Sequence, residues 1–452
     1  MNDIINFLDL EDENLVIEDI AIEESNKTIT ISTKPTFHCC PICQSVMYSK
    51  GLKTRTIRHP ILQDGYSLII KLKQRRWKCT NKECAYDMQE SFKFVNKNRK
   101  VTNHADLMIV LAFKDLNKTA EDIGKEHNIS GHLAMDIFNK YVHPKRHVLP
   151  TVISVDEVYL DMDSKCKYVL VLQDFVTGEP IDLVRSRRKE FTLPYFSNIP
   201  IKERGNVKYV ISDMYNPYLE YVNQYFPNAI SIVDSFHIML WIIGKLDIYL
   251  KKLVKKYKER DEKAFKSKIH RFNQEKIPIS DEVYLLQNYR WFLLKNADHI
   301  EYYSEAKFNS HFKMYMNTYD LEKKFFEIDA NLSVLRDLKE IYVEFNNSNA
   351  GKPDIAALEL EELINYYSNC GQPIFVEFAK LLKKHKQPII NSFIHFEKIT
   401  SSGETIESRL SNGPIESLNR KAKDLKRSGR GYSNFEHLRK RFLFATRKDI
   451  SL

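Results

Sequence analysis

Two short cysteine pairs constrain the N-terminal part of this 452-residue chain more than any other feature. Two residues separate Cys40 from Cys43, and four separate Cys79 from Cys84. Four thiolates at such spacings hold one tetrahedral zinc ion when each pair lies on its own turn. The alternating stretch YSLIIKLKQRRWKC, which precedes the second pair, predicts strands that bring the turns together. We therefore expect a structural zinc site that helps a small domain to fold.

The residues beside the first pair leave one ligand open. His38 and Cys39 directly precede Cys40, and either is an alternative first ligand, although Cys40 with Cys43 has the usual spacing. The cysteines number seven, and the acidic N-terminus is unlike a signal peptide. We therefore expect a cytoplasmic metal site rather than a disulfide framework.

The charge distribution predicts a polyanionic partner. The whole chain carries a formal net charge of +9, but its first 26 residues hold nine acids and no Lys or Arg, which leaves +18 on the remainder. A body this basic favours nucleic acid. Arg75 and Arg76, beside Trp77, are candidate DNA contacts, with an exposed strand face as the alternative. The longest apolar run, residues 236–244, is too short to span a bilayer, so no membrane partner is expected.

Residues 119–142 read as two short helices joined by a tight turn. Thr119 can cap the first helix, with Asp122 three residues on as a weak form of the capping box, and Ser130 can cap the second. The apolar residues of the second helix recur at a spacing of four: Leu133, Ile137 and Tyr141. This pattern predicts a DNA-binding helix-turn-helix, with a plain three-helix bundle as the alternative.

The next part of the chain predicts a mixed sheet that carries acidic residues at its edge. Runs rich in Val and Ile predict strands at 151–160, 167–175, 181–186, 208–213 and 229–234, the first three antiparallel and the last two joined by a helix. Asp156 lies in the first strand and Asp213 ends the fourth. If these strands are neighbours, their carboxylates can share a pair of hard divalent cations, as two-metal phosphoryl transfer requires.

A third acid opens a basic helix near the C-terminus. Asn412, Gly413 and Pro414 predict a helix start, which places Glu416 in the first turn. The favourable interaction of an acid with the helix dipole is the alternative reason for that position. The helix then carries a cationic face suited to phosphates. The candidate DNA-binding residues there are Arg420, Lys423, Lys426, Arg427 and Arg430.

Asp234 competes with Asp213 for the second catalytic position, because it too ends an apolar strand. Asp234 and His237 are separated by two residues, which places them one helical turn apart. We interpret both as residues that support the catalytic site, and direct metal binding by Asp234 stays open.

Taken together and in order, the segments HCCPIC, RRWKCTNKEC, VDEVYL, SDMYNPY, VDSFH and SNGPIESLNRKAKDLKRSGRGYSNFEHLRKRFLF resemble the bacterial insertion-sequence transposases of the ISL-three family over nearly the full chain. The resemblance implies a DDE transposase with an N-terminal zinc finger and a ribonuclease-H-like core. Related Mutator-type enzymes carry an acid or cysteine, two residues and a histidine after the second catalytic aspartate, which Asp234 and His237 match.

The expected fold is a multidomain α/β chain. It comprises an acidic lead (1–34), a small zinc-ribbon-like domain (35–98), a helix-turn-helix (99–148), the first part of a ribonuclease-H-like mixed-sheet core (149–240), a large all-helical insertion (241–405) and the C-terminal helices of the core (406–452).

The expected function is metal-dependent cleavage at insertion-sequence ends and strand transfer into target DNA. Asp156, Asp213 and Glu416 would hold two Mg²⁺ or Mn²⁺ ions, and a structural Zn²⁺ would bind the cysteines. The expected partner is double-stranded DNA, both terminal inverted repeats and target, bound by a homodimer or larger assembly at the bacterial nucleoid. The alternatives are a non-catalytic DNA-binding regulator and a metal-dependent nuclease without strand transfer.

Overall fold

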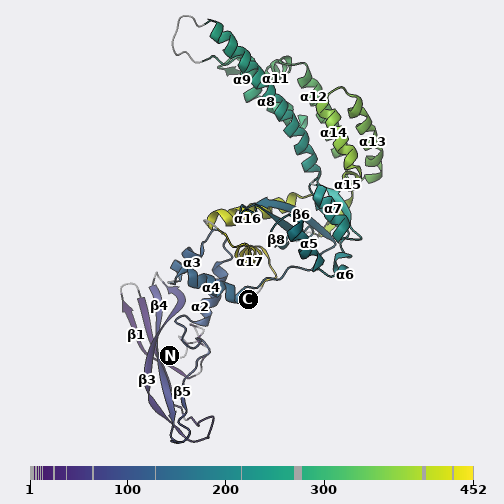
Figure 1. The fold of residues 1–452 in the computed structure, drawn as a ribbon. Coiled ribbons are helices and arrows are strands. Elements are labelled where there is room, and N and C mark those ends of the chain that lie inside the picture. Colours follow the sequence, from purple (N-terminus) through teal and green to yellow (C-terminus); the bar gives the residue numbers. More distant parts are fainter. Residues whose placement is uncertain are drawn as a thin grey trace. The chain divides into compact units, whose positions relative to one another are not determined.

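Figure 1 shows the helices and strands of the computed structural model. The chain divides into two compact units. The first unit comprises Met1–Arg146, Tyr159–Lys167 and Arg420–Leu452, and the second comprises His147–Val158 and Tyr168–Asn419. The structure describes residues 5, 8, 10, 12, 14–23, 26–36, 38–63, 66–127, 129–214, 216–268, 277–399, 404–429 and 432–450.

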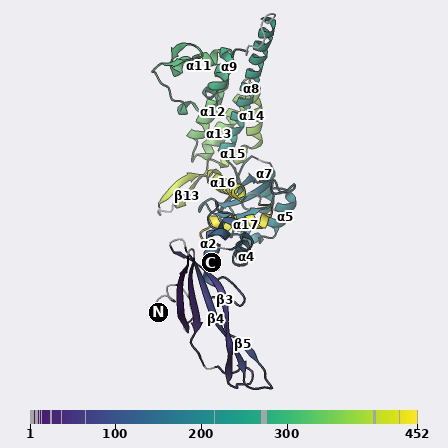
Figure 2. The ribbon, with the colours of Figure 1, turned by 90° about the vertical axis from the view of Figure 1, so that its left-hand side faces the viewer.

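A five-stranded sheet forms the N-terminal part of the first unit. Its strands are β1 (Leu15–Glu23), β2 (Asn26–Thr33), β3 (Met47–Gln63), β4 (Tyr66–Cys79) and β5 (Asp87–Gln89). The order is β1-β2-β4-β3, with β5 also paired to β4, and the long strands β3 and β4 run side by side (Figure 2). Leu68, Ile70 and Leu72 of β4 are buried, as the alternating pattern predicts. The strands of the acidic lead therefore belong to the same sheet as those of the cysteine region.

Four helices share one core in the first unit: α2 (Asn103–Ala112), α3 (Ala120–Glu126), α4 (Gly131–Tyr141) and α17 (Phe435–Thr446). The predicted caps are confirmed, since Thr119 and Asp122 form a capping box on α3 and the Ser130 hydroxyl accepts from the Leu133 amide on α4. The predicted apolar face of α4 is partly wrong, because Leu133 and Tyr141 are 36% and 42% exposed. The buried face instead uses Ala134, Ile137 and Phe138.

The second unit contains the predicted mixed sheet. Its strands, in the order β10-β9-β6-β7-β8, are β6 (Val152–Tyr159), β7 (Tyr168–Asp174), β8 (Pro180–Val184), β9 (Tyr209–Ser212) and β10 (Ile230–Val233). The pairs β6–β9 and β9–β10 are parallel, whereas β7–β8 is antiparallel. The hydrogen bonds Phe175 N to Val152 O and Leu160 N to Lys167 O join opposite ends of β6 and β7, so these strands are also antiparallel.

Short helices cover this sheet. They are α5 (Lys189–Ser197), α6 (Ile201–Arg204) and α7 (Asn216–Tyr225). Phe196 of α5 and Val222 of α7 pack with Ile153 and Leu170 in one core. Because the helices and neighbouring residues cover the sheet, its strands are apolar along nearly their whole length. Continuous runs of Val and Ile are typical of such covered strands.

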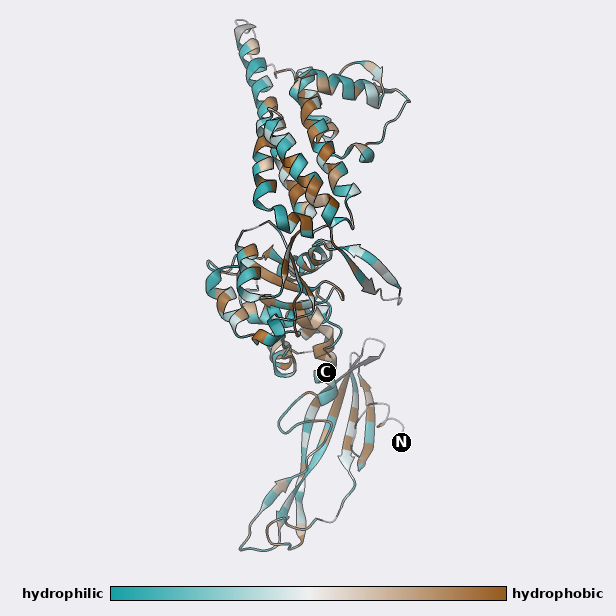
Figure 3. Ribbon diagram, turned by 90° about the vertical axis from the view of Figure 1, so that its right-hand side faces the viewer, coloured by the Kyte–Doolittle hydropathy of each residue, from teal (hydrophilic) through white to brown (hydrophobic). Residues whose placement is uncertain are grey.

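A helical region follows β10. Its helices are α8 (Ser235–Lys268), α9 (Asp281–Asn288), α10 (Trp291–Leu294), the 3₁₀ turn η1 (Ala297–His299), α11 (Thr318–Glu327), α12 (Asn331–Ser348), α13 (Pro353–Asn369), α14 (Pro373–Lys384) and α15 (Lys386–Asn391). Apolar residues, brown in Figure 3, lie where these helices pack, and polar ones lie outside. None of the helices among the described residues is long and apolar enough to cross a membrane.

The all-helical expectation for residues 241–405 is wrong in two places. Strands β11 (Lys307–Asn309) and β12 (Met314–Met316) form one hairpin, and β13 (His395–Ile399) and β14 (Thr405–Arg409) form another. The second hairpin leads into α16 (Gly413–Ser428), which begins where the sequence predicted and has Glu416 in its first turn. The division between the two units falls within this helix, after Asn419.

We expect Gly124→Ala to destabilise the protein by about 1–3 kcal/mol, because the added methyl group meets backbone that cannot move freely. A Cβ atom at Gly124 would lie 2.8 Å from both Gly131 N and Ile129 O, where α3 meets α4. The measurement is the free energy of unfolding by denaturant.

The matched control is Gly244→Ala in α8, where a Cβ atom meets nothing within 4 Å. Alanine there should stabilise the helix by up to about 1 kcal/mol. An equal gain at Gly124 would show that α3 and α4 do not approach each other this closely.

Candidate active site and zinc centre

The four predicted zinc ligands form one cluster. The sulfur atoms of Cys40, Cys43, Cys79 and Cys84 all lie within 4.8 Å of one another. The Cys40–Cys84 and Cys43–Cys79 Sγ distances are 3.6 and 3.4 Å. A zinc ion with Zn–S bonds of about 2.3 Å places its sulfur ligands roughly 3.8 Å apart, so this arrangement fits tetrahedral zinc.

Two hydrogen-bonded turns present these thiols. In the first, Gln44 N donates to Cys40 O, and Cys40 N donates to Ser45 O. In the second, Cys84 N donates to Asn81 O, and Cys79 N donates to Tyr86 O. Thr80 N donates to Val46 O and holds the turns together. These backbone hydrogen bonds, within each turn and between the two turns, position the four thiols.

The alternative ligands lie outside the cluster. Cys39 is exposed, whereas Cys40 is fully buried. The His38 ring packs against Trp77 with ring centroids 4.6 Å apart, and its Nε2 lies 2.8 Å from the Thr36 hydroxyl.

Hydrogen bonds from Ser45 lower the pKa of Cys43 to about 6, whereas burial raises the pKa of Cys79 to about 12. A divalent ion would stabilise all four as thiolates.

Strand register brings the predicted aspartates to one sheet edge. Ser154 of β6 pairs with Ile211 of β9, so the register continued by two residues aligns Asp156 with Asp213. Val233 of β10 pairs with Ser212, and one further residue aligns Asp234 with Asp213. Asp156 lies within β6, whereas Asp213 and Asp234 directly follow β9 and β10, and the continued register places the three acids side by side on adjacent parallel strands about 4.8 Å apart.

Asp156 occupies the most perturbed position at this edge. Burial raises its pKa to about 6, and the charge of Asp213 acts in the same direction. Three neighbours oppose this rise: the Glu157 amide, which donates to Oδ1 at 2.7 Å, the His237 ring, and Asn419, whose Nδ2 donates to Oδ2 at 2.7 Å. Asp156, Asp213 and His237 are thus close enough to interact electrostatically.

Two asparagines attach the start of α16 to β6. Asn412 Nδ2 donates to Val155 O at 3.2 Å, and Asn419 donates to Asp156 as described. Glu416 lies one helical turn before Asn419 and is exposed. The sequence analysis named Asn412 only as part of a helix start and did not identify Asn419. The i, i+3 spacing of Glu416 and Asn419 was the available signal, because it places them on neighbouring positions of one helix.

Glu157 points away from this edge into a network of its own. It accepts from Tyr218 and pairs with Arg187, whose guanidinium carbon lies 4.4 Å from the Tyr168 ring centroid. Tyr221 in turn donates to Arg187 O at 2.7 Å. This network holds β6 against α7 and fixes the residue next to Asp156, and no local sequence pattern indicates it.

Asp234 acts as the N-terminal cap of α8. Its side chain accepts from the Phe236 amide at 3.2 Å, its backbone N–H donates to Ser212 O at 3.0 Å, and it is 2% exposed. Its charge also acts on Arg409, whose pKa burial lowers and Asp234 raises. Capping at this buried position favours the supporting role over direct metal binding.

The carboxylates of Asp156, Asp213 and Glu416 do not form a compact ligand set. Within the described ranges, the groups whose ligand atoms all lie within 4.8 Å include the cysteines but not these three acids. A site for two ions that lie roughly 3.5–4 Å apart has a wider span than one ion requires. The two aspartates interact electrostatically. Glu416 is included in the candidate set because its helix, α16, is attached to the strand of Asp156.

The candidate DNA-binding residues differ in accessibility. Arg420, Lys423 and Arg427 are exposed on α16, on the same helical face as Glu416, whereas Lys426 Nζ donates to Tyr432 O. Arg76 is exposed, but Arg75 is half-buried, with its guanidinium 5.9 Å from the Trp77 ring centroid. Arg430 lies outside the described residues.

A sequence model for the transposases of the ISL-three type matches residues 153–442. The match begins in β6 and ends in α17, so it includes the aspartates, Glu416 and the helical region, but not the cysteine cluster. No curated protein matches the chain significantly.

Cys79→Ser should abolish zinc binding and destabilise the sheet around the cluster, because it removes one of four ligands and leaves three thiols in a partly buried site. Zinc content per chain is measured by metal analysis of the purified protein. Cys39→Ser, one residue outside the cluster, should retain the wild-type content. Equal zinc in wild type and Cys79→Ser would rule out the site.

Asp156→Asn should stabilise the cation-free protein at pH 7.5 by up to about 3 kcal/mol, since the pKa of Asp156 rises from 3.8 to about 6. The raised pKa means that the folded protein binds this proton more tightly than the unfolded chain. The charged Asp156 therefore destabilises the folded protein fully above about pH 6, and this destabilisation fades as the pH falls toward 4. Thermal unfolding in the presence of a chelator, at pH 7.5 and at about pH 4, measures the gain in stability.

The control for this effect is Glu416→Gln, which removes an exposed carboxylate from the same region. Its unfolding temperature should match that of the wild type at both pH values. A gain from Asp156→Asn that does not depend on pH would contradict the desolvation of this carboxylate.

Proposed function

The chain belongs to the ISL-three family of transposases, and from this premise we propose that it cuts DNA at the ends of an insertion sequence and joins those ends to target DNA. The match covers residues 153–442, about two thirds of the chain. The proposed reaction is phosphoryl transfer on double-stranded DNA, with the terminal inverted repeats and the target as substrates. It needs no covalent protein–DNA intermediate.

One observation carries this proposal: β6 and β9 pair in parallel with Ser154 opposite Ile211, and this register, continued by two residues, aligns Asp156 with Asp213. Two residues that are 57 positions apart meet there, and Asp156 senses the charge of Asp213. Such clustering of carboxylates is unfavourable unless a cation or proton compensates it. The strand order β10-β9-β6-β7-β8, with β9 and β10 parallel to β6, supports the ribonuclease-H-like core that the family resemblance implies.

We assign Asp156, Asp213 and Glu416 as the residues that hold two divalent cations. The donor set consists of carboxylate oxygens alone, which suits Mg²⁺ or Mn²⁺. When bound, such ions activate a water or 3′-hydroxyl and stabilise the leaving oxygen. Asp156 offers a carboxylate already held by Asn419 and the Glu157 amide, so little reorganisation is needed.

The remaining residues of the site have positioning and binding roles. Asn412 and Asn419 keep the helix of Glu416 on the strand of Asp156, and Asp234 fixes the start of α8, from which His237 acts on Asp156. Arg420, Lys423 and Arg427 continue the face of Glu416 and would contact DNA phosphates next to the reacting bond. Because two element ends must be held together, the active form would be a homodimer or larger.

Asp213→Asn and Glu416→Gln should each bind a duplex carrying the element end as the wild type does but cut less than about one-thousandth as fast, because each loses a cation ligand. Cleavage and strand transfer are followed on labelled element ends with Mg²⁺. Glu190→Gln, at an exposed position of α5, is the control and should cut normally.

The outcomes distinguish this proposal from its alternatives. Cutting without joining by the wild type would identify a nuclease. Unchanged biological activity in Asp156→Ala would identify a regulator that uses only its DNA-binding modules. Normal cutting by Asp213→Asn would remove this residue from the catalytic set.

A further inference from the structure

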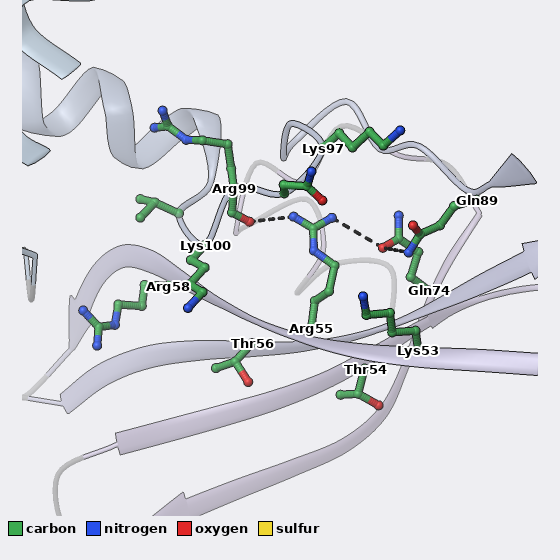
Figure 4. Close-up of a pocket in the computed structure, with 12 residues that line it drawn as sticks. Lys53, Thr54, Arg55, Thr56, Arg58, Gln74, Gln89, Lys97, Arg99 and Lys100 are labelled. Carbon is green, nitrogen blue, oxygen red and sulfur yellow. Dashed lines mark hydrogen bonds between the residues drawn. The ribbon is translucent and has the colours of Figure 1, made fainter. Parts of the chain in front are cut away.

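A basic groove lies in the first unit, outside the cysteine cluster and the carboxylate edge. It is a hollow of about 550 Å³ between β3 and residues 97–101, the segment that precedes α2 (Figure 4). Six of its twelve lining residues are Lys or Arg, and none is acidic: Lys53, Arg55, Arg58, Lys97, Arg99 and Lys100. Such a concentration of one sign of charge focuses the field on an anionic partner.

The groove is held open by contacts that do not depend on a ligand. Arg58 N donates to Lys100 O at 2.8 Å, and Thr102 N donates to Arg58 O at 3.1 Å, which fixes the segment on β3. Arg55 spans the hollow and donates to Arg99 O at 2.5 Å and to Gln74 Oε1 at 3.4 Å (Figure 4). The walls are therefore preorganised, so binding orders little additional chain.

Most of the cationic charge in the groove is uncompensated. Within the described part of the chain, Arg99 alone among the groove cations has a carboxylate partner, the buried Asp106, which also accepts from Tyr141 at 3.0 Å. Arg55 contacts only neutral oxygens, and its burial lowers its pKa, so a nearby anion would stabilise its charged form. Among the described residues, no hydrogen bond or ion pair engages the side chains of Lys53, Arg58, Lys97 or Lys100.

The composition of the walls indicates which part of a nucleic acid fits. The lining residues include no aromatic side chain on which a base could stack, and Val101 is the only apolar one. Lysine and arginine side chains without neighbouring aromatic rings recognise phosphates rather than base edges. A groove of this kind contacts the backbone and carries no sequence information.

We propose that this groove binds the phosphate backbone of duplex DNA and acts as a sequence-independent clamp for the DNA engaged by the N-terminal unit. The proposal rests on the proposed function, since it assigns to one groove a share of the DNA binding that the reaction requires. It does not involve the carboxylates, so binding and cutting can be tested separately.

The test compares the full-length, zinc-loaded wild type with the triple variant Lys53→Ala, Lys97→Ala, Lys100→Ala. Binding to a random-sequence duplex of about 30 base pairs is measured by fluorescence anisotropy over a range of salt concentrations. The variant should bind roughly ten- to a hundred-fold more weakly at low salt, and the slope of log K against log [salt] should fall by about 0.9 per lost contact. Zinc content and unfolding temperature should match the wild type, because these side chains form no hydrogen bond or ion pair with the residues that the structure describes.

A second triple variant controls for net charge. Lys252→Ala, Lys258→Ala and Lys263→Ala remove the same charge from exposed positions of α8. This control should keep the wild-type affinity and salt slope. An equal loss in both variants, or no loss in the groove variant, would overturn the proposal.

Inorganic tripolyphosphate distinguishes a small anion from DNA. If the groove variant loses tripolyphosphate binding but binds the duplex normally, the groove is a site for a free phosphate and the proposal is wrong. Failure of the catalytic assignment would look different, since the Asp213→Asn protein would cut DNA while the groove variant still showed its binding defect.

Discussion

The candidate active site depends on a carboxylate that is kept mostly out of water. Asp156 ends an apolar stretch of β6, and the fold surrounds it with Asn419, His237 and a second carboxylate, Asp213. Removing an ionised group from water is unfavourable unless a partner compensates it. The hydrogen bonds from Asn419 and the Glu157 amide compensate only in part, because the pKa of Asp156 stays raised. Because of this remaining imbalance, we expect a bound cation to stabilise this edge.

The same residue connects the parts of the second unit. Parallel pairing aligns Asp156 with Asp213, and the hydrogen bond from Asn419 attaches α16, which carries Glu416. Asp234 uses its side chain to begin α8, so the helical region starts from the same sheet edge. Farther along, Asn391 Nδ2 donates to Ser231 O in β10 and brings the end of the helical region back to the sheet. Both ends of the helical region therefore lie next to β10.

The first unit uses a different source of order. Its cysteine turns have only a small apolar cluster around them, in which Met47 and Trp77 pack with the thiols, so a metal ion is the natural cross-link. The sheet that carries these turns also forms one wall of the basic groove, because Lys53 and Arg58 lie on β3. A rigid sheet holds the lysine and arginine side chains of the groove at fixed positions, which favours binding to a stiff polyanion such as duplex DNA.

Local patterns in the sequence predicted several elements well. Runs of Val and Ile located β6 to β10 to within a residue or two, since continuous apolar strands need cover on both faces. Asn412-Gly413-Pro414 located the start of α16, and the cysteine spacing identified four thiols that do cluster. The assignment of Asp156, Asp213 and Glu416 as cation ligands stays a prediction. The exposed Leu133 and Tyr141 show the limit of spacing alone, since a period of four residues does not say which face meets the core.

The sequence by itself determined which residues could do chemistry: the four thiols, the acids at strand ends and the basic face after Glu416. Only the tertiary structure decided which of them meet. Strand register aligned Asp156 with Asp213, and a hydrogen bond between residues 263 positions apart tied α16 to β6. The groove likewise joins Lys53 to Lys97 and Lys100 through backbone pairing at Arg58. Hydrogen bonds and charges act over a few ångströms of space and not along the chain, so no local pattern could reveal these contacts.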